Sequence, residues 1–301
     1  MQRRVVGAER RVVGAERRVI GAGRRVIGAE RRVIGLLRQC AAVALRDAAL
    51  QRSYGVSVAL GALSGALGLV GYHFIGRLVP ADGSSALPPA GYFPFVCTGL
   101  MLHGMVAALL GALGGVLARE AAEGTLEPAL ASGAAPTALL AGGAVVPVGL
   151  ALVQALVYAG AGSVLFDVAW SQAHLAVAAL AIVATLVACA PIGLAGAALW
   201  LVLRRPGLVT TLTAFAFGLL GGVYFPVDLL PAPLRAIAGW VPLALGLEAF
   251  RGALLAGAGV VDCAPALLRL FLIAALTLPP SIWLLRRAWR SAREHGSLAL
   301  V

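Results

Sequence analysis

The sequence contains no lysine and no asparagine, and only 12% of its 301 residues are charged. Without lysine the chain cannot build a P-loop, whose lysine reaches the β- and γ-phosphates of a nucleotide, or form a Schiff base with a carbonyl substrate. Without asparagine it has no N-glycosylation acceptor. The four cysteines are widely separated and lack metal-ligand spacing, so we expect neither a disulfide framework nor a zinc site.

Apolar residues, in contrast, are in large excess. They make up 60% of the chain, and the mean hydropathy is +0.93. An average soluble domain is about 45–50% apolar. One soluble core could not hide this much apolar surface, so the solvent around most of the chain must be lipid. The composition therefore predicts an all-α integral membrane protein with one membrane domain.

Positive charge is concentrated near the N-terminus. Residues 1–39 hold +8 of the net charge of +11. Residues 1–35 are a tandem arginine-rich heptapeptide with adjacent rather than spaced apolar residues and a recurring glycine, which disfavours a coiled coil. We interpret them as a low-complexity arm; a basic arm on an anionic membrane surface is the alternative. This location of the charge gives no support to a nucleic-acid partner.

The rest of the chain divides by hydropathy. Residues 36–53 are predicted to form an amphipathic interfacial helix. Residues 54–293 are predicted to form a six-span membrane domain, and residues 294–301 are predicted to form a cytoplasmic tail. A hydrocarbon core about 30 Å thick requires about 20 apolar residues per helix. Six segments meet this length: 54–75, 92–117, 139–166, 174–203, 207–225 and 267–285.

The stretch 226–261 is apolar but is interrupted by prolines and charges. Proline breaks helices, and charges are rare in membrane spans. We therefore predict a re-entrant or interfacial helical hairpin before the last span. Arginines flanking the six spans number nine on one side and four on the other, which predicts cytoplasmic termini. The nine are Arg46, Arg52, Arg119, Arg204, Arg205, Arg286, Arg287, Arg290 and Arg293; the four are Arg77, Arg235, Arg251 and Arg269.

A cluster of acids follows the second predicted span. Three glutamates fall within eight residues there, and a short amphipathic helix with exposed carboxylates would suit docking onto a soluble partner. An ordinary solvated loop is the alternative. The segment resembles the coupling helix of type-2 ABC exporter permeases, which contacts the ATPase subunit in that family. The residues that carry the resemblance are Arg119, Glu120, Glu123, Gly124, Thr125, Leu126 and Glu127.

A second resemblance to the same family lies in the proline-rich stretch. The run Gly-Gly-Val-Tyr-Phe-Pro-Val-Asp-Leu-Leu-Pro at 221–231 precedes a Pro-Leu step and a helix ending near arginine, as in the family's outer re-entrant hairpin. The candidate residues are Phe225, Pro226, Pro231, Pro242, Glu248 and Arg251. From the residues alone, Glu248 and Arg251 lie three apart on a helix, so we expect them to pair.

Together the motifs imply the permease subunit of an ATP-driven exporter in a bacterial-type cytoplasmic membrane. The resemblance implies an ABC ATPase partner that binds ATP and Mg²⁺, a hydrophobic or amphipathic substrate, and pairing as a homodimer or with a related permease. The chain itself is expected to bind membrane lipid but no cofactor or metal, and to catalyse no reaction. One alternative is an ion-coupled transporter, which would need mid-span carboxylates. Another is an intramembrane protease using Ser64 and His103, which lacks a Gly-x-Ser-x-Gly frame.

Overall fold

The computed structural model describes residues 34–51, 55–78, 91–126, 128, 135–168, 170, 173–203 and 208–294. Within these residues the chain is almost entirely helical and contains no strand, which confirms the all-α prediction. Residues 34–51 form the first helix. The elements that follow are α2 (Gly55–Leu78), α3 (Tyr92–Ala122), α5 (Pro136–Phe166), α6 (Leu175–Leu203), α7 (Leu208–Leu220), a 3₁₀ turn (Val227–Leu229), α8 (Ala232–Ala238), α9 (Pro242–Leu255) and α10 (Val260–Glu294).

The membrane-spanning layout agrees with the sequence. In the described part of the chain, α3, α5, α6 and α10 are each long and apolar enough to cross a bilayer. Helices α8 and α9 meet at a 75° bend and form a broken pair. With α2 and the shorter α7, this arrangement is consistent with six spans and a helical hairpin before the last one.

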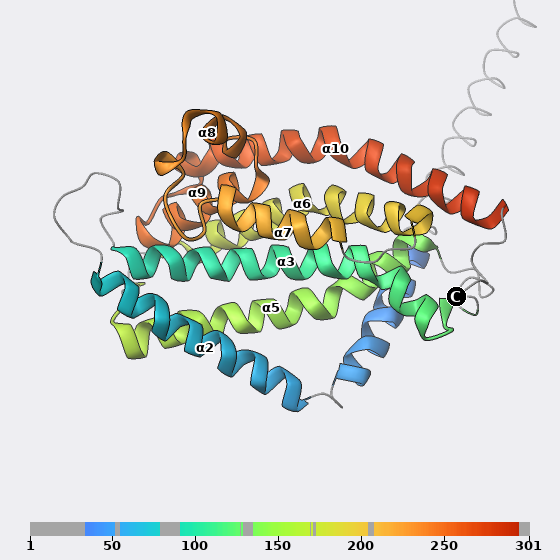
Figure 1. The fold of residues 1–301 in the computed structure, drawn as a ribbon, viewed down its shortest axis with the longest axis horizontal. Coiled ribbons are helices and arrows are strands. Elements are labelled where there is room, and N and C mark those ends of the chain that lie inside the picture. The colour runs from blue at the N-terminus through green and yellow to red at the C-terminus, as the bar shows by residue number, and fades with distance from the viewer. Residues whose placement is uncertain are drawn as a thin grey trace, which may run out of the picture.

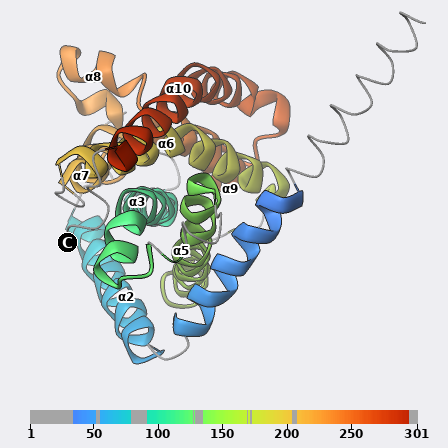
Figure 2. The same cartoon turned by 90° about the vertical axis from the view of Figure 1, so that its right-hand side faces the viewer.

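Helix α3 is the centre of the bundle, surrounded by α2, α5, α6 and α7 (Figure 2). Small residues let the helices approach closely, as in other membrane bundles. A Cβ on Gly143 of α5 would lie 2.7 Å from a Val116 methyl, and one on Gly193 of α6 would lie 2.7 Å from Leu113 Cβ. Side chains of α3 therefore occupy the space left by glycines on α5 and α6, and this allows both helices to pack closely against α3.

The predicted boundaries of three spans were wrong. Helix α7 stops at Leu220 rather than continuing to residue 225, because Gly222 adopts φ +74° and turns the chain. Helix α3 runs without a break to Ala122, five residues past the predicted end of the span. Helix α10 extends beyond the predicted 267–285 at both ends.

The bundle has two distinct ends (Figure 1). One end, which we call the hairpin end, contains α8, α9 and the starts of α3 and α10, and α9 packs against both α3 and α10. At the opposite end, called the charged end, lie the helix of residues 34–51 and the last turns of α3 and α10. The described arginines of the two predicted groups separate accordingly: Arg46, Arg119, Arg286, Arg287 and Arg290 are at the charged end, and Arg77, Arg235, Arg251 and Arg269 are on helices of the hairpin end. Most of the repeat arm and nearly all of the C-terminal tail lie outside the described residues.

Candidate functional site

An ion pair ties the start of the acidic segment to the first helix. Glu120 in the last turn of α3 is buried, and both of its carboxylate oxygens accept hydrogen bonds from the Arg46 guanidinium. One of these bonds measures 3.1 Å, from Arg46 Nη1 to Glu120 Oε2. Arg46 also donates to the neighbouring Asp47. The bond to Glu120 raises the pKa of Arg46, so this guanidinium is charged throughout the physiological range.

The helix of residues 34–51 is placed for this contact by close packing on α5. A Cβ on Gly142 would lie 2.8 Å from both the Cys40 carbonyl oxygen and Val43 Cβ, so only glycine allows this approach. The side chain of Gln39 accepts a hydrogen bond from the Ala135 backbone N–H just before α5 begins. The sequence therefore brings Arg46 to α3 by docking its helix across the start of α5.

The segment after Glu120 turns sharply. Gly124 has φ +68°, a conformation that strains any residue with a Cβ. The Thr125 N–H then donates to the Glu120 carbonyl at 2.9 Å, and its hydroxyl donates to the Glu120 carboxylate at 2.6 Å. Leu126 follows with its side chain buried in the apolar cluster of the charged end. Both the backbone and the side chain of Thr125 thus bond to Glu120, and these bonds close the turn.

The expectation of three exposed carboxylates was wrong for Glu120. Its side chain faces Arg46 and Thr125, because a carboxylate held at the edge of the apolar core needs hydrogen-bonding partners. Arg119 and Glu123 are exposed, and Glu127 lies outside the described residues. The separate helix that we expected does not begin at Arg119, since residues 119–122 are the last turn of α3. The exposed charged side chains in the described part of this segment are those of Arg119 and Glu123.

A second constellation, built around Arg251 of α9, lies at the hairpin end. Its guanidinium donates to the Phe95 carbonyl at 2.8 Å, to the Val223 carbonyl at 3.4 Å and to Thr98 Oγ1 at 3.3 Å. The guanidinium carbon also lies 3.5 Å from the centre of the Phe95 ring, a close cation–π contact. Arg251 therefore joins the hairpin to the first turns of α3 and to the chain that leaves α7.

The expected pair of Glu248 with Arg251 does not form. Glu248 is exposed, and Arg251 turns instead towards the carbonyls of α3 and of residue 223. The other predicted hairpin residues define its path: Pro226 caps the 3₁₀ turn, Pro231 precedes α8, and Pro242 starts α9. Phe225 is partly buried in the bend between α7 and this turn.

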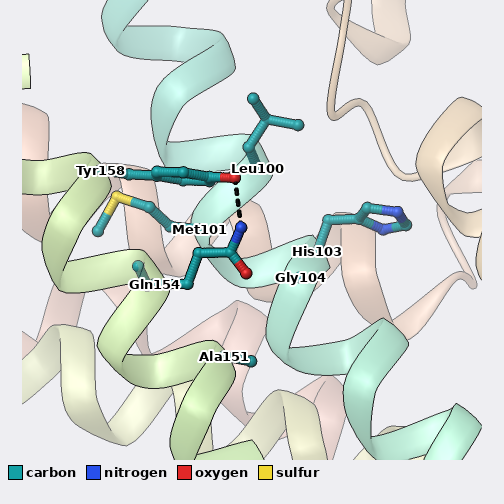
Figure 3. Close-up of a pocket in the computed structure, with 8 residues that line it drawn as sticks. Leu100, Met101, His103, Gly104, Ala151, Gln154 and Tyr158 are labelled. Carbon is teal, nitrogen blue, oxygen red and sulfur yellow. Dashed lines mark hydrogen bonds between the residues drawn. The ribbon is translucent and has the colours of Figure 1, made fainter. Parts of the chain in front are cut away.

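Sequence reasoning missed a polar pair inside the bundle. Gln154 Nε2 donates to the Tyr158 hydroxyl at 2.7 Å across one turn of α5, in a cavity of about 130 Å³ between α3 and α5 (Figure 3). His103 of α3 also lines the cavity but extends away from this pair. Its buried Nδ1 has no hydrogen-bond partner among the described residues. The four-residue spacing of Gln154 and Tyr158 in an apolar run was the available signal.

The comparisons with known proteins identify the family. The family model described as ABC-2 type transporter matches residues 53–255, which is more than half of the chain. The chain belongs to the ABC-2 type transporter family. No curated protein matches it significantly.

The match makes the chain a multi-pass ABC transporter permease. It spans α2 to α9 and includes both the turn around Gly124 and the hairpin around Arg251. The helix of residues 34–51 and helix α10 lie beyond the matched range. Within the described part of this ABC-2 membrane domain, no three His, Cys, Asp or Glu side chains are close enough to hold a metal ion.

Replacing Gly65 with valine is expected to disrupt the packing of α2 on α5. A Cβ at Gly65 would collide with the Tyr158 hydroxyl and lie 2.7 Å from Gln154 Nε2, whereas a Cβ at Gly68 would meet no atom within 4 Å. Overpacking of this kind costs roughly 1–3 kcal/mol. The thermal unfolding midpoint of Gly65→Val in detergent should therefore fall by several degrees below that of Gly68→Val. Equal midpoints would show that α2 is not packed at Gly65 as described.

Proposed function

We propose that this permease is the membrane subunit of an ATP-driven exporter whose ATPase is a separate polypeptide. The family match over both motif segments supports this proposal, and the absence of lysine means that this chain has no P-loop. ATP and Mg²⁺ would be bound by the ATPase partner. The permease would bind neither and would catalyse no bond cleavage.

The docking surface for the ATPase is proposed to be the exposed face formed by Arg119, Glu123 and the Gly124 turn. These residues project from the last turn of α3, and the Arg46–Glu120 ion pair holds their backbone in place. A push on this turn would act on α3 as one continuous helix of 31 residues. The other end of α3 carries Phe95 and Thr98, the partners of Arg251, so movement would reach the hairpin. ATP would have to favour one conformation through contacts that differ between states.

The charged end is proposed to face the cytoplasm of a bacterial-type cell, with both termini on that side. The described arginines of the larger group gather there, as the positive-inside rule requires. The cavity between α3 and α5, at about 130 Å³, is smaller than typical ligand sites of about 300–1,000 Å³. The path for a hydrophobic or amphipathic substrate is proposed to lie not in this cavity but between this chain and a second copy or a related permease.

The test is co-purification. The permease would be expressed together with any ABC ATPase encoded beside its own gene, and the bound ATPase would be measured after purification in mild detergent. Reversing the exposed charge with Glu123→Arg is expected to lower retained ATPase roughly tenfold, because charge reversal at a docking rim weakens association. Glu248→Arg, which reverses an exposed acid at the hairpin end, is the matched control and should retain the wild-type amount.

Two results would overturn the proposal. If no ATPase associates with a folded permease, ATP-driven export fails, and ion-coupled transport is the model to test next. If the ATPase associates but Glu123→Arg and Glu248→Arg retain it equally, the docking surface is not the turn after α3.

A further inference from the structure

A groove of about 790 Å³ lies between the hairpin and the first half of α10. Its hairpin wall includes Gly239 and Trp240, at the bend that joins α8 to α9. Its α10 wall includes Arg269, Leu272, Leu276 and Thr277. Helix α9 packs against α10, whereas α8 projects from the bundle to one side (Figure 2). The groove is separate from the cavity between α3 and α5 and from both constellations described above.

The charge pattern of α10 places the mouth of the groove at a membrane boundary. No charged residue occurs between Arg269 and Arg286, and residues 270–285 form about 24 Å of helix. This length is close to the hydrocarbon thickness of about 30 Å. Arg269 is thus at headgroup level on the hairpin side, and Leu272 and Leu276 lie deeper in the apolar layer.

Arg269 differs from the other three arginines of the hairpin end. Arg77 lies over the Phe74 ring, Arg235 donates to the carbonyls of residues 228 and 230, and Arg251 has the contacts given above. The exposed Arg269 makes no ion pair, hydrogen bond or ring contact with any described residue. Arg269 is therefore a positive charge at the mouth of an apolar groove. No described residue of this chain supplies its counter-charge.

We propose that this groove binds an anionic phospholipid of the bilayer. The phosphate would pair with the Arg269 guanidinium, whose planar donors match phosphate oxygens in a two-point contact. Trp240, 74% exposed, would lie at headgroup level, where tryptophan is enriched. One acyl chain would follow α10 from Leu272 to Thr277. This inference rests on the chain being a membrane protein and does not depend on the ATPase or on the direction of transport.

A phospholipid fits this groove better than a second copy of the chain. Of the four long apolar helices, α10 has the smallest buried share, so this side of the bundle faces the surroundings. An apolar helix from a second copy would fill the groove, but that copy would also have to bring an acid such as its exposed Glu248 to Arg269, because an unpaired charge at an apolar interface is costly. An anionic lipid supplies both the acyl chain that fills the groove and the negative charge that pairs with Arg269.

The first experiment measures retained lipid by native mass spectrometry of the full-length protein in detergent. Phosphatidylglycerol and phosphatidylcholine would be added in turn to wild type, Arg269→Gln and the matched control Arg77→Gln. We expect wild type and Arg77→Gln to bind phosphatidylglycerol at least tenfold more tightly than Arg269→Gln does. Phosphatidylcholine, which has no net charge, should bind all three weakly and alike. Equal phosphatidylglycerol binding by Arg269→Gln and wild type would overturn the proposal.

The second experiment blocks the groove. Leu276 lines it, and Leu268, which is similarly exposed on the same helix, does not. Leu276→Trp should lower phosphatidylglycerol retention severalfold, while Leu268→Trp should leave it unchanged, with both variants keeping the wild-type unfolding midpoint. If Leu276→Trp instead leaves lipid retention intact and reduces the dimer mass, a second copy occupies the groove and the lipid assignment is wrong.

Discussion

Replacing Arg251 with methionine is expected to lower the thermal unfolding midpoint by roughly 5–10 °C, corresponding to about 2–4 kcal/mol. The guanidinium satisfies the carbonyls of residues 95 and 223 and the Thr98 hydroxyl, and it also lies over the Phe95 ring. Methionine keeps much of the apolar volume but provides no donor. The loss would leave these acceptors with fewer partners at the junction between the hairpin and α3.

The buried thiols of Cys97, Cys189 and Cys263 report this unfolding directly, because they react with a thiol-specific dye only when the bundle opens. The more accessible Cys40 would be replaced with alanine to remove the background signal. Arg235→Met is the control. Among the described residues, the exposed Arg235 bonds only within the same hairpin, so its loss should cost much less. If both variants melt like wild type, Arg251 does not hold the hairpin to α3.

Gly99→Ala offers an independent check of the same junction. A Cβ at Gly99 would lie 2.6 Å from the Val223 carbonyl oxygen and 2.8 Å from Arg251 Nη2. The methyl group would therefore push the guanidinium from its acceptors without removing it. We expect a fall in the unfolding midpoint in the same direction as for Arg251→Met, and the two effects should not add, because both break one contact.

Replacing Glu120 with alanine is expected to cost about 2–3 kcal/mol and to release the helix of residues 34–51 from α3. Breaking a buried ion pair by removing one partner typically costs about 3–5 kcal/mol, and the 40% exposure of the Arg46 side chain reduces that figure here. The hydroxyl of Thr125 also loses its acceptor. Labelling of Cys40, which lies on the released helix, should become faster.

A double-mutant cycle separates the pair from its surroundings. We expect the cost of Arg46→Ala plus that of Glu120→Ala to exceed the cost of the double variant by about 1–3 kcal/mol, since the two residues are in direct contact. Glu123→Ala is the control, because this exposed neighbour makes no ion pair with any described residue. Additive costs for Arg46 and Glu120 would show that their ion pair contributes nothing to stability.

The bundle and its broken hairpin could be predicted from the sequence because both depend on local features. Apolar runs of about 20 residues form helices in lipid, where backbone groups must bond within the segment. The prolines at 226, 231, 233 and 242 predicted the breaks in the hairpin. The acidic segment and the run at 221–231 also pointed to the family that the comparison identified. Each of these features can be recognised without knowing which helices touch.

Tertiary structure alone decided which polar groups meet. Glu120 and Arg46 are 74 positions apart, and Arg251 bonds to the carbonyl of residue 95, which lies 156 positions away. Hydropathy could not distinguish buried Glu120 from exposed Glu123, or assign Arg251 to a carbonyl rather than to Glu248. A charge at the edge of an apolar core takes the partner that helix packing brings within reach. That packing depends on where glycines such as Gly142 and Gly143 let helices approach, which is a property of the whole bundle.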